Sequence, residues 1–465
     1  MMKLPYLVVV ALSSLWLSCL PISAQVYTQP EQVHLSLGEN PGQLVVTWVT
    51  QAETNGSYVE YGIDQLNQVA TGTVDKFTDG GVLKRVLYMH RTVLSNIKPM
   101  VKYMYHCGSS DGWSPIYSFN GMRTDTDWSP RFALFGDMGN KNAQSLGRLQ
   151  EETQKDHFDV IVHVGDFAYN MDTDNAAVGD AFMNQIQSIA AYVPYMTCVG
   201  NHEAAYNFSN YMSRFTMPKK QGDGHNMFFS FDVGPVHFVS FSSEYYYFTE
   251  YGWKQIVSQY KWLEQDLKKA NEPQNRKRRP WIISMCHRPL YCSNSDDPEH
   301  CTNNENIIRI GFPETDRLYS IEDLLYKYGV DLHFQAHEHS YERMWPVYNM
   351  TVCNGTEEDP YNNPPAPVHI VTGSGGCQEG EDPFLAVPNP WSAYHSDDYG
   401  YTRMQVIDDK HLYLEQVSDD QGGAVIDKML IRKDAHGPGT FNCHKQQKPQ
   451  DLPWMKSYKP NQKVK

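Results

Sequence analysis

The sequence predicts two domains, a β-sandwich followed by a larger α/β domain, and three observations carry this prediction. The chain has 465 residues, which is too long for one ordinary domain. Short, regularly spaced strand patterns occupy its first part, as in a sandwich. After Pro130, apolar strands alternate with polar loops and helical segments, which is typical of α/β folds. We assign the sandwich to residues 25–125 and the α/β domain to residues 129–435.

Residues 1–24 have the pattern of a secretory signal peptide. Lys3 gives a positive start, residues 4–20 are mostly apolar, and the segment ends in small residues at Ser23 and Ala24. An N-terminal membrane anchor is the alternative, but serines interrupt the apolar run and no basic cluster follows it. We therefore expect a secreted or lysosomal protein with no membrane span in the mature chain.

Two further features agree with export. Nine cysteines occur, and the eight that remain after loss of Cys19 can pair in an oxidising compartment. Cys292 and Cys301 lie close together in a polar loop and are the best candidates for one disulfide, whereas Cys286 is expected to be a core thiol. Four Asn-x-Ser/Thr triplets are candidate glycosylation sites, at Asn55, Asn207, Asn349 and Asn354.

The sandwich is predicted from segments rich in β-branched and aromatic residues that turn signals separate. The strand segments are residues 44–49, 59–61, 90–94 and 101–106, with turns at 40–42, 79–81 and 111–112. We find no metal-ligand motif in this part. Residues 124–127 are expected to link the two domains.

In the α/β domain, five apolar strands each lead directly to a motif of polar residues. In such folds the active groups lie in loops at the carboxyl ends of the strands, so we expect the motifs to meet. The strands are residues 132–135, 160–164, 193–199, 281–286 and 330–335, and the motifs begin at Gly136, Gly165, Gly200, His287 and His337.

The remaining segments complete the α/β pattern. Helices are expected at residues 143–154, 183–191, 251–270 and 321–328, a strand pair at 227–233 and 236–243, and closing strands at 401–406, 412–417 and 428–431. The loop at residues 373–376 is interpreted as a tight turn, because it lacks the Lys-Ser/Thr of a phosphate-binding loop. Residues 436–465 are expected to be a mobile tail.

The motifs together supply seven possible metal ligands. Two metal ions can clamp a phosphoryl group if one anionic ligand bridges them and each ion has ligands of its own. Carboxylate and phenolate oxygens favour a hard ion of high charge such as Fe(III), whereas neutral amide and imidazole donors suit Zn(II), Mn(II) or Fe(II). The seven residues are Asp137, Asp166, Tyr169, Asn201, His287, His337 and His339.

Each ligand has a simpler interpretation when taken alone. A Gly-Asp pair after a strand is commonly a turn or a helix cap, and Tyr169 by itself is more often a packed ring. His337 and His339 by themselves fit ordinary loop histidines. His163 lies inside a strand and is interpreted as a core residue. Five motifs in this order, each after an apolar strand, favour a common site over these separate interpretations.

Three neighbouring residues have predicted supporting roles. His202 follows Asn201 and is expected to point near the metals without binding one, which suits substrate contact or protonation of a leaving group. Glu203 is expected to orient His202. Glu338, between two ligand histidines, is expected to point away from the metals and support the ligands from behind.

On these five motifs the chain resembles the purple acid phosphatases, which are metallophosphoesterases whose larger animal and plant type has an N-terminal fibronectin III-like β-sandwich. The resemblance covers residues 131–417 and, for the sandwich, 30–124. It implies that Fe(III) is bound by Asp137, Tyr169 and His339, that Asp166 bridges, and that Asn201, His287 and His337 bind a second divalent ion, Zn, Fe or Mn. It also implies an acid phosphatase that hydrolyses phosphate monoesters with a metal-bound hydroxide as nucleophile, while His202 assists the leaving group. Other metallophosphoesterases have a histidine where this chain has Gly139.

The chain departs from the family pattern at two places. Ala336 replaces the glycine of the last motif, which is tolerated unless the backbone there has a positive φ. Plant members carry substrate-contacting histidines in the loop after His287. The corresponding residues 291–301 are acidic, and His300 is the only histidine there. Phosphate contacts outside the metals, and the range of substrates, are therefore open.

The net charge of −15 argues against nucleic acid as a partner. A small phosphorylated substrate still fits, because bound cations reverse the local field. Two alternatives stay open: a hydrolase of phosphodiesters or pyrophosphate bonds with the same metals, and a non-catalytic protein that binds through its β-sandwich. The natural substrate, the oligomeric state and any contribution of the N-terminal domain to the site are also open.

Overall fold

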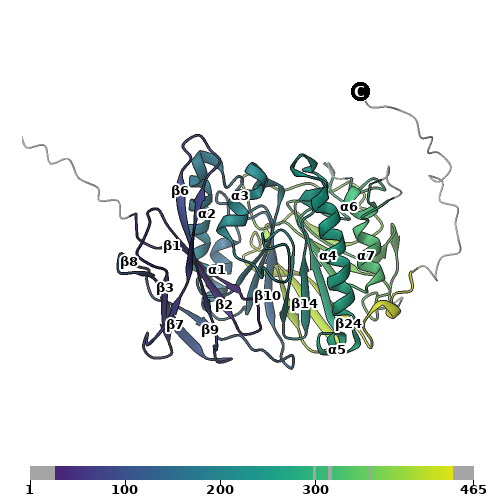
Figure 1. Ribbon diagram of the computed structural model, residues 1–465. Coiled ribbons are helices and arrows are strands. Elements are labelled where there is room, and N and C mark those ends of the chain that lie inside the picture. Colours follow the sequence, from purple (N-terminus) through teal and green to yellow (C-terminus); the bar gives the residue numbers. More distant parts are fainter. Residues whose placement is uncertain (1–26, 297–299, 313–316, 357, 444–465) are drawn as a thin grey trace, which may run out of the picture.

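A computed structural model describes residues 27–296, 300–312, 317–356 and 358–443. The predicted signal peptide and the tail beyond residue 443 lie outside the described residues. Figure 1 shows the β-sandwich on one side of the molecule and the α/β domain on the other. Within the described part of the chain, no helix combines the length and the apolar character that a bilayer crossing requires.

The N-terminal domain is a β-sandwich, as predicted. Its two antiparallel sheets share a core that includes Val46, Trp48, Tyr105 and Phe119. One sheet has the order β1 (Glu31–Leu37), β2 (Leu44–Thr50), β6 (Val86–Leu94) and β5 (Thr73–Thr78). The other has the order β4 (Gln68–Thr71), β3 (Tyr58–Gly62), β7 (Lys102–Ser109) and β8 (Gly112–Trp113), and β9 (Tyr117–Asn120) also pairs with β7.

The first sheet of the α/β domain has six strands. Its strands β10, β11 and β12 are parallel, and three antiparallel strands from the C-terminal part close it. The β-branched and aromatic residues of the three parallel strands are buried on both faces, as expected for strands covered on both sides. The order is β12 (Tyr195–Cys198), β11 (Val160–Val164), β10 (Arg131–Phe135), β22 (Gly400–Val406), β23 (His411–Ser418) and β24 (Ala424–Arg432).

The second sheet has seven strands and packs on the first, with the rings of Phe132 and Phe238 5.1 Å apart across the interface. Strands β14, β15, β16 and β20 are parallel. The order is β13 (Phe229–Val233), β14 (Val236–Ser240), β15 (Trp281–Met285), β16 (Leu332–Gln335), β20 (Val368–Thr372), β17 (Tyr341–Met344) and β21 (Ser392–Ser396). Strands β18 (Val347–Tyr348) and β19 (Thr351–Val352) form a separate hairpin.

Helices cover the two sheets from outside. Figure 1 shows α1–α3 on the side of the β-sandwich and α4–α7 on the opposite side. The first group is α1 (Leu146–Gln154), α2 (Thr173–Ala190) and α3 (Ala205–Arg214), and the second is α4 (Lys254–Ala270), α5 (Pro273–Arg278), α6 (Ile307–Ile310) and α7 (Ile321–Lys327). Short 3-10 turns are η1 (Asn201–Glu203), η2 (Glu244–Tyr246), η3 (Thr249–Tyr251) and η5 (Pro438–Thr440). The sheets therefore lie between two helical layers.

Several local features differ from the sequence prediction. Helix α2 begins ten residues before the predicted residue 183, and α4 begins at Lys254 after a 3-10 turn rather than at residue 251. Residues 174–176 in α2 and 206–208 in α3 have positive φ angles, which interrupt the right-handed helix. Residues other than glycine are strained in this backbone conformation. Neither turn contains a glycine or a proline from which it could have been predicted.

The C-terminal segment differs as well. The mobile tail was expected from His436, but His436 packs edge-on against Trp281, and Cys443 is bonded to Cys353. The described chain is thus packed up to Cys443. The predicted Cys292–Cys301 disulfide is present, and Cys286 is a buried free thiol as expected.

Candidate metal centre

Five loops bring the seven predicted ligands together at the carboxyl ends of the parallel strands. Asp137 follows β10, Asp166 and Tyr169 follow β11, and Asn201 follows β12. The second sheet contributes His287 after β15, and His337 and His339 after β16. Neighbouring parallel strands end at the same edge of each sheet, and the two sheets pack together, so ligands spread over residues 137–339 meet in one place.

The first group of side chains consists of Asp137, Tyr169 and His339. The Tyr169 hydroxyl lies 2.8 Å from Nε2 of His339 and 3.4 Å from Oδ1 of Asp137. Nε2 of His339 and Oδ1 of Asp137 are 3.8 Å apart. These are the three residues that the sequence assigned to the same ion.

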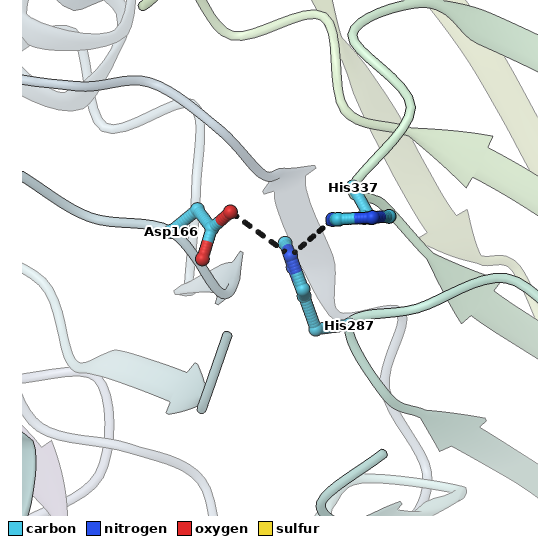
Figure 2. A group of neighbouring side chains, drawn as sticks. All are labelled: Asp166, His287 and His337. Atoms are coloured by element: carbon cyan, nitrogen blue, oxygen red, sulfur yellow. Dashed lines mark hydrogen bonds and ion pairs between the residues drawn. The ribbon is translucent and has the colours of Figure 1, made fainter. Parts of the chain in front are cut away.

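The second group surrounds Nε2 of His287. This atom lies 3.0 Å from Oδ1 of Asn201, 3.2 Å from Nδ1 of His337 and 3.1 Å from Oδ2 of Asp166. Figure 2 shows Asp166 and His337 on either side of His287. The two groups adjoin, because Oδ1 of Asp137 is 3.9 Å from the same His287 nitrogen.

Backbone carbonyls set the tautomers of two of the histidines. Nδ1 of His287 is 2.9 Å from the carbonyl oxygen of Val164, and Nδ1 of His339 is 2.8 Å from that of Gly380. Each Nδ1 therefore donates its proton, which leaves the lone pair of Nε2 directed into the site. In this tautomer the His287 lone pair faces the oxygen lone pairs of Asn201 and Asp166. Such an arrangement is repulsive unless a proton on Nε2 or a metal ion lies among these atoms, so the donor set fits a metal ion.

Burial of the acidic side chains also favours a positive charge in the site. It raises the pKa of the Asp137 carboxyl well above its ordinary value, with the Asp166 carboxylate adding to the effect against the opposing charge of His287. Burial lowers the pKa of His287, but the Asp166 and Asp137 carboxylates outweigh it and raise that pKa to about 10. Burial also raises the pKa of the Tyr169 hydroxyl well above its ordinary value. A bound cation would relieve all three effects.

The two aspartates each use one oxygen for the backbone and leave the other for the site. Oδ2 of Asp137 accepts a hydrogen bond from the His337 backbone N–H at 3.0 Å, and Oδ1 of Asp166 accepts one from the His202 N–H at 2.9 Å. Asp137, Asp166, Tyr169 and His337 all have positive φ angles, between 52° and 74°. Non-glycine residues in this region are strained by about 1 kcal/mol or more each, and such strain gathers at functional sites.

Glycines next to the ligands permit this close approach. A Cβ on Gly200 would lie 2.2 Å from Oδ1 of Asp166, and one on Gly165 would lie 2.4 Å from Nδ1 of His287. Ala336, which replaces a family glycine, is not among the residues with positive φ, so its methyl group is tolerated as predicted. The Ala336 methyl group does require a glycine at position 136, because a Cβ on Gly136 would lie 2.4 Å from it.

The prediction for Glu203 is wrong. Its buried carboxylate accepts hydrogen bonds from the backbone N–H groups of Asp166, Phe167 and Gly200, each at 3.0 Å. It therefore ties two ligand loops together and does not orient His202. Two carboxyl oxygens suit three converging donors. Burial and the Asp166 carboxylate nevertheless raise the pKa of Glu203 to about 8.

His202 is oriented by Asn170 instead. Oδ1 of Asn170 lies 2.9 Å from Nδ1 of His202, and the His202 ring packs on the Tyr169 ring with centroids 4.3 Å apart. The other nitrogen, Nε2, is 3.9 Å from Oδ2 of Asp166 and 3.7 Å from the carboxylate of Glu379. His202 is partly exposed, so it lies at the mouth of the site rather than among the buried ligands.

A group of residues on the loop after β20 also borders the site and was not predicted from the sequence. The Asp382 carboxylate accepts a hydrogen bond from the His339 N–H at 2.7 Å, and Sγ of Cys377 is 3.5 Å from Nδ1 of His339. The turn that precedes them packs on the Asp137 loop through a bond from the Gly375 N–H to the Gly136 oxygen. Only this packing brings the loop to the site, so no local motif could have indicated it.

The other predicted residues lie outside the ligand cluster. Oε1 of Glu338 is 3.7 Å from Sγ of Cys301, so this carboxylate is directed toward the disulfide. His163 is a buried core residue whose Nδ1 is 2.7 Å from the Tyr195 hydroxyl, as interpreted. His300 lies on an exposed loop. Among the sequons, Asn55, Asn207 and Asn354 are exposed and Asn349 is half-buried.

Three segments of the chain match models of known protein families. Residues 130–341 match the calcineurin-like phosphoesterase model. Residues 30–120 match the N-terminal domain of purple acid phosphatase, and residues 366–428 match the iron/zinc purple acid phosphatase-like protein C model.

Whole-chain comparisons agree with these matches. The chain is 53% identical to acid phosphatase type 7 of Danio rerio over 419 residues, which cover 89% of this chain and 94% of that protein. It is 50% identical to acid phosphatase type 7 of Homo sapiens, with 88% and 92% covered. A solved structure of a purple acid phosphatase from yellow lupin (Lupinus luteus) seeds superposes with a TM-score of 0.73 at 25% identity, covering 88% of this chain and 75% of the lupin chain.

Proposed function

The chain belongs to the purple acid phosphatase family and is an acid phosphatase, and on this premise we propose that it hydrolyses phosphate monoesters with two metal ions held by the seven converging residues. The observation that carries the proposal is the geometry of two adjoining donor groups, one around the Tyr169 hydroxyl and one around Nε2 of His287.

The donor types support a division of the ligands between two different ions. Asp137, Tyr169 and His339 would hold Fe(III), because a buried phenol gives up its proton only beside a cation of high charge. Asn201, His287 and His337 would hold a divalent ion, Zn, Fe or Mn. Asp166, whose Oδ2 faces the second group, would bridge the two ions.

When bound, the metal pair supplies an attacking hydroxide in acid and offsets the charge that develops on the phosphoryl group. The chain itself provides the proton for the leaving oxygen. His202 stands at the mouth of the site with Nδ1 held by Asn170, so Nε2 is directed toward the site. Transfer of the Nε2 proton to the departing ester oxygen yields a neutral alcohol.

The proposal includes a secreted or lysosomal setting. Two disulfides among the described cysteines, and four sequons at exposed or half-buried positions, support an oxidising compartment and a glycoprotein. Peptide mapping of protein purified from culture medium would identify the first residue of the mature chain and any sugar-bearing asparagine. A chain that begins at Met1 and stays inside the cell would contradict this part.

The decisive experiment measures phosphate release from an aryl phosphate against pH, together with metal content. We expect activity that peaks in acid and that is lost in His337→Ala, which removes a ligand of the divalent ion. Higher rates on a diester or a pyrophosphate than on the monoester would favour the alternative hydrolase. Folded protein without bound metal and without activity would favour a binding protein.

A further inference from the structure

Helix α4 carries a row of exposed lysines on its outer side. Lys254, Lys261 and Lys268 are spaced by almost two helical turns each, so their side chains lie along one ridge of the helix. The row spans about 21 Å at the rise of an α-helix. Ser258 and Gln265, which lie between the lysines on this ridge, are exposed and uncharged. Figure 1 shows α4 along the outside of the second sheet, with α5 at its lower end.

A short basic run in and after α5 extends this row. Residues 276–279 are Arg-Lys-Arg-Arg, and α5 follows α4 after a link of only two residues, 271 and 272. Arg276 and Arg279 are turned inward, where they pair with carboxylates at 2.9 and 3.2 Å. Lys277 and Arg278 are exposed. The exposed cations of the two helices together form a basic ridge, which consists of Lys254, Lys261, Lys268, Lys277 and Arg278.

Carboxylates do not neutralise the basic ridge. Within the described part of the chain, none of its five cations forms an ion pair, whereas the exposed Lys327 pairs with Glu264 at 2.7 Å. The other carboxylate of α4, Asp266, lies 2.8 Å from His237 on a different side of the helix. Glu272, in the link between the helices, accepts hydrogen bonds from two side chains of α5. The ridge is therefore a line of free positive charge on a chain of net charge −15.

The α5 end of the ridge lies away from the metal centre. Helix α5 leads into the amino end of β15, whereas His287 follows the carboxyl end of the same strand. The two ends of β15 lie at opposite edges of the second sheet. A ligand that covers the α5 end of the basic ridge therefore leaves the catalytic site open to substrate.

The geometry favours a long polyanion over a small anion. A small anion is bound where donors converge, but the lysines of α4 follow one another at intervals of roughly 10 Å along a line. An anionic membrane fits less well, because the apolar residues Ile256, Leu263 and Leu267 of α4 are buried and cannot insert into lipid. Single-stranded nucleic acid stacks its bases on aromatic rings, whereas the ridge positions of α4 hold only lysine, serine and glutamine.

We propose that the basic ridge binds sulfated polysaccharide chains. Sulfate groups repeat along such chains and attract clustered lysine and arginine side chains through their charge. The inference goes beyond hydrolysis and takes from the proposed function only the secreted setting, in which such polysaccharides occur. Binding through the ridge would hold the enzyme at an extracellular matrix while the catalytic site continues to accept small phosphate esters.

The test measures binding of the full, metal-loaded chain to a heparin decasaccharide in about 0.15 M NaCl. A ridge variant replaces four cations by glutamine, which favours helices, and is written Lys261→Gln/Lys268→Gln/Lys277→Gln/Arg278→Gln. We expect wild-type protein to bind and the ridge variant to bind at least about tenfold more weakly, because fewer counterions are released. The wild-type affinity should fall steeply as salt is added, and desulfated heparin should not bind.

A control variant removes the same charge from exposed positions on the β-sandwich and β24. It is written Lys76→Gln/Lys98→Gln/Lys102→Gln/Lys428→Gln and is expected to bind heparin within about twofold of wild type, because a uniform loss of charge acts only at long range. Both variants should hydrolyse an aryl phosphate as wild type does, with or without heparin.

The outcomes separate this inference from the proposed function. Absence of heparin binding by the wild-type protein, or equal losses in the two variants, overturns the proposal. Tighter binding of phosphatidylserine vesicles or single-stranded DNA than of heparin assigns the ridge to another partner and also overturns it. Inhibition of hydrolysis by heparin that persists in the ridge variant places heparin at the metal centre and counts against the ridge. Protein that binds heparin through the ridge but hydrolyses no ester contradicts the proposed function alone.

Discussion

At the residue scale, the site depends on side chains that serve backbone and metal centre at once. Asp137 and Asp166 each accept a backbone N–H with one oxygen while the other faces the donor cluster. This double use fixes the carboxylates before any ion arrives, which lowers the conformational entropy lost on binding. It also explains why the aspartates keep strained left-handed backbone angles.

Replacing His202 tests the proposed role in proton donation. We expect His202→Ala to lower kcat about 100-fold for an alkyl phosphate, whose alkoxide is a poor leaving group. The loss for an aryl phosphate with an acidic phenol should be much smaller, because that leaving group needs less help. Steady-state kinetics on both esters from pH 4 to 8 would measure this. The same loss on both esters would argue against proton donation.

Replacing Glu203 tests the clamp between two ligand loops. Glu203→Gln keeps the shape but leaves one oxygen for three N–H donors and adds a donor of its own. We expect the free energy of unfolding to fall by about 1–3 kcal/mol, because buried donors lose their acceptor. Thermal unfolding and metal content would be measured beside Glu250→Gln, an exposed control. Equal stability of the two variants would contradict the clamp.

At the element scale, hairpin β13–β14 and helix α4 hold a partly buried ion cluster beside the N-terminal domain. His237 lies 2.8 Å from both Asp232 and Asp266, and these residues line a cavity of about 290 Å³ together with Glu39 and Arg123 from the side of the sandwich. Burial lowers the pKa of His237, but Asp266 and Asp232 outweigh it and raise the pKa to about 10. The protonated imidazole therefore stabilises the folded state.

This raised pKa predicts how stability changes with pH. The contribution of His237 is complete below its unfolded pKa near 6.5 and is lost as pH rises through its folded pKa of about 10. The shift corresponds to at most about 5 kcal/mol. We expect His237→Gln to lower the melting temperature at pH 5 and to flatten its decline between pH 7 and 10. A variant that declines as steeply as the wild type over this range would contradict the assignment.

At the scale of the whole molecule, buried charges join the C-terminal segment to the second sheet. Lys433 and Arg276 both pair with the buried Asp331, which ties the segment after β24 to the second sheet, and the Cys353–Cys443 disulfide fixes its end. Although burial opposes it, the charges of Lys433 and Arg276 hold the pKa of Asp331 well below its usual range. Both ion pairs of Asp331 therefore persist in the acid where the enzyme is proposed to work.

Metal removal is expected to weaken the whole fold. Without a metal ion, a proton on His287 is left to offset the buried carboxylates of Asp137 and Asp166. A ligand that binds only the folded state stabilises it by roughly 3 kcal/mol at a hundredfold excess over its Kd. Prolonged chelation should lower the melting temperature, and iron with zinc should restore it in a concentration-dependent way. An unchanged melting temperature after verified metal loss would contradict this expectation.

The sequence by itself determined the fold class and brought out the ligand set. Apolar strands are recognised from local sequence patterns, and each ligand motif directly follows its strand. The positions of Asp137, Asn201 and His337 at strand ends could therefore be predicted without knowledge of the packing. Membership of the family confirms the predicted fold class and the family resemblance. The alternation of strand and helix also implied parallel strands whose carboxyl ends meet.

Only the tertiary structure decided what surrounds the ligands. The true partner of His202, the clamp role of Glu203, the loop with Cys377 and Asp382, and the docking of residues 79–85 on α2 and α3 all join segments far apart in the chain. Such contacts produce no periodic pattern in the sequence, because they depend on how the elements pack and on which buried N–H groups need an acceptor. Local patterns in the sequence determine the strands and the order of the ligands, whereas long-range packing decides how the ligands are held.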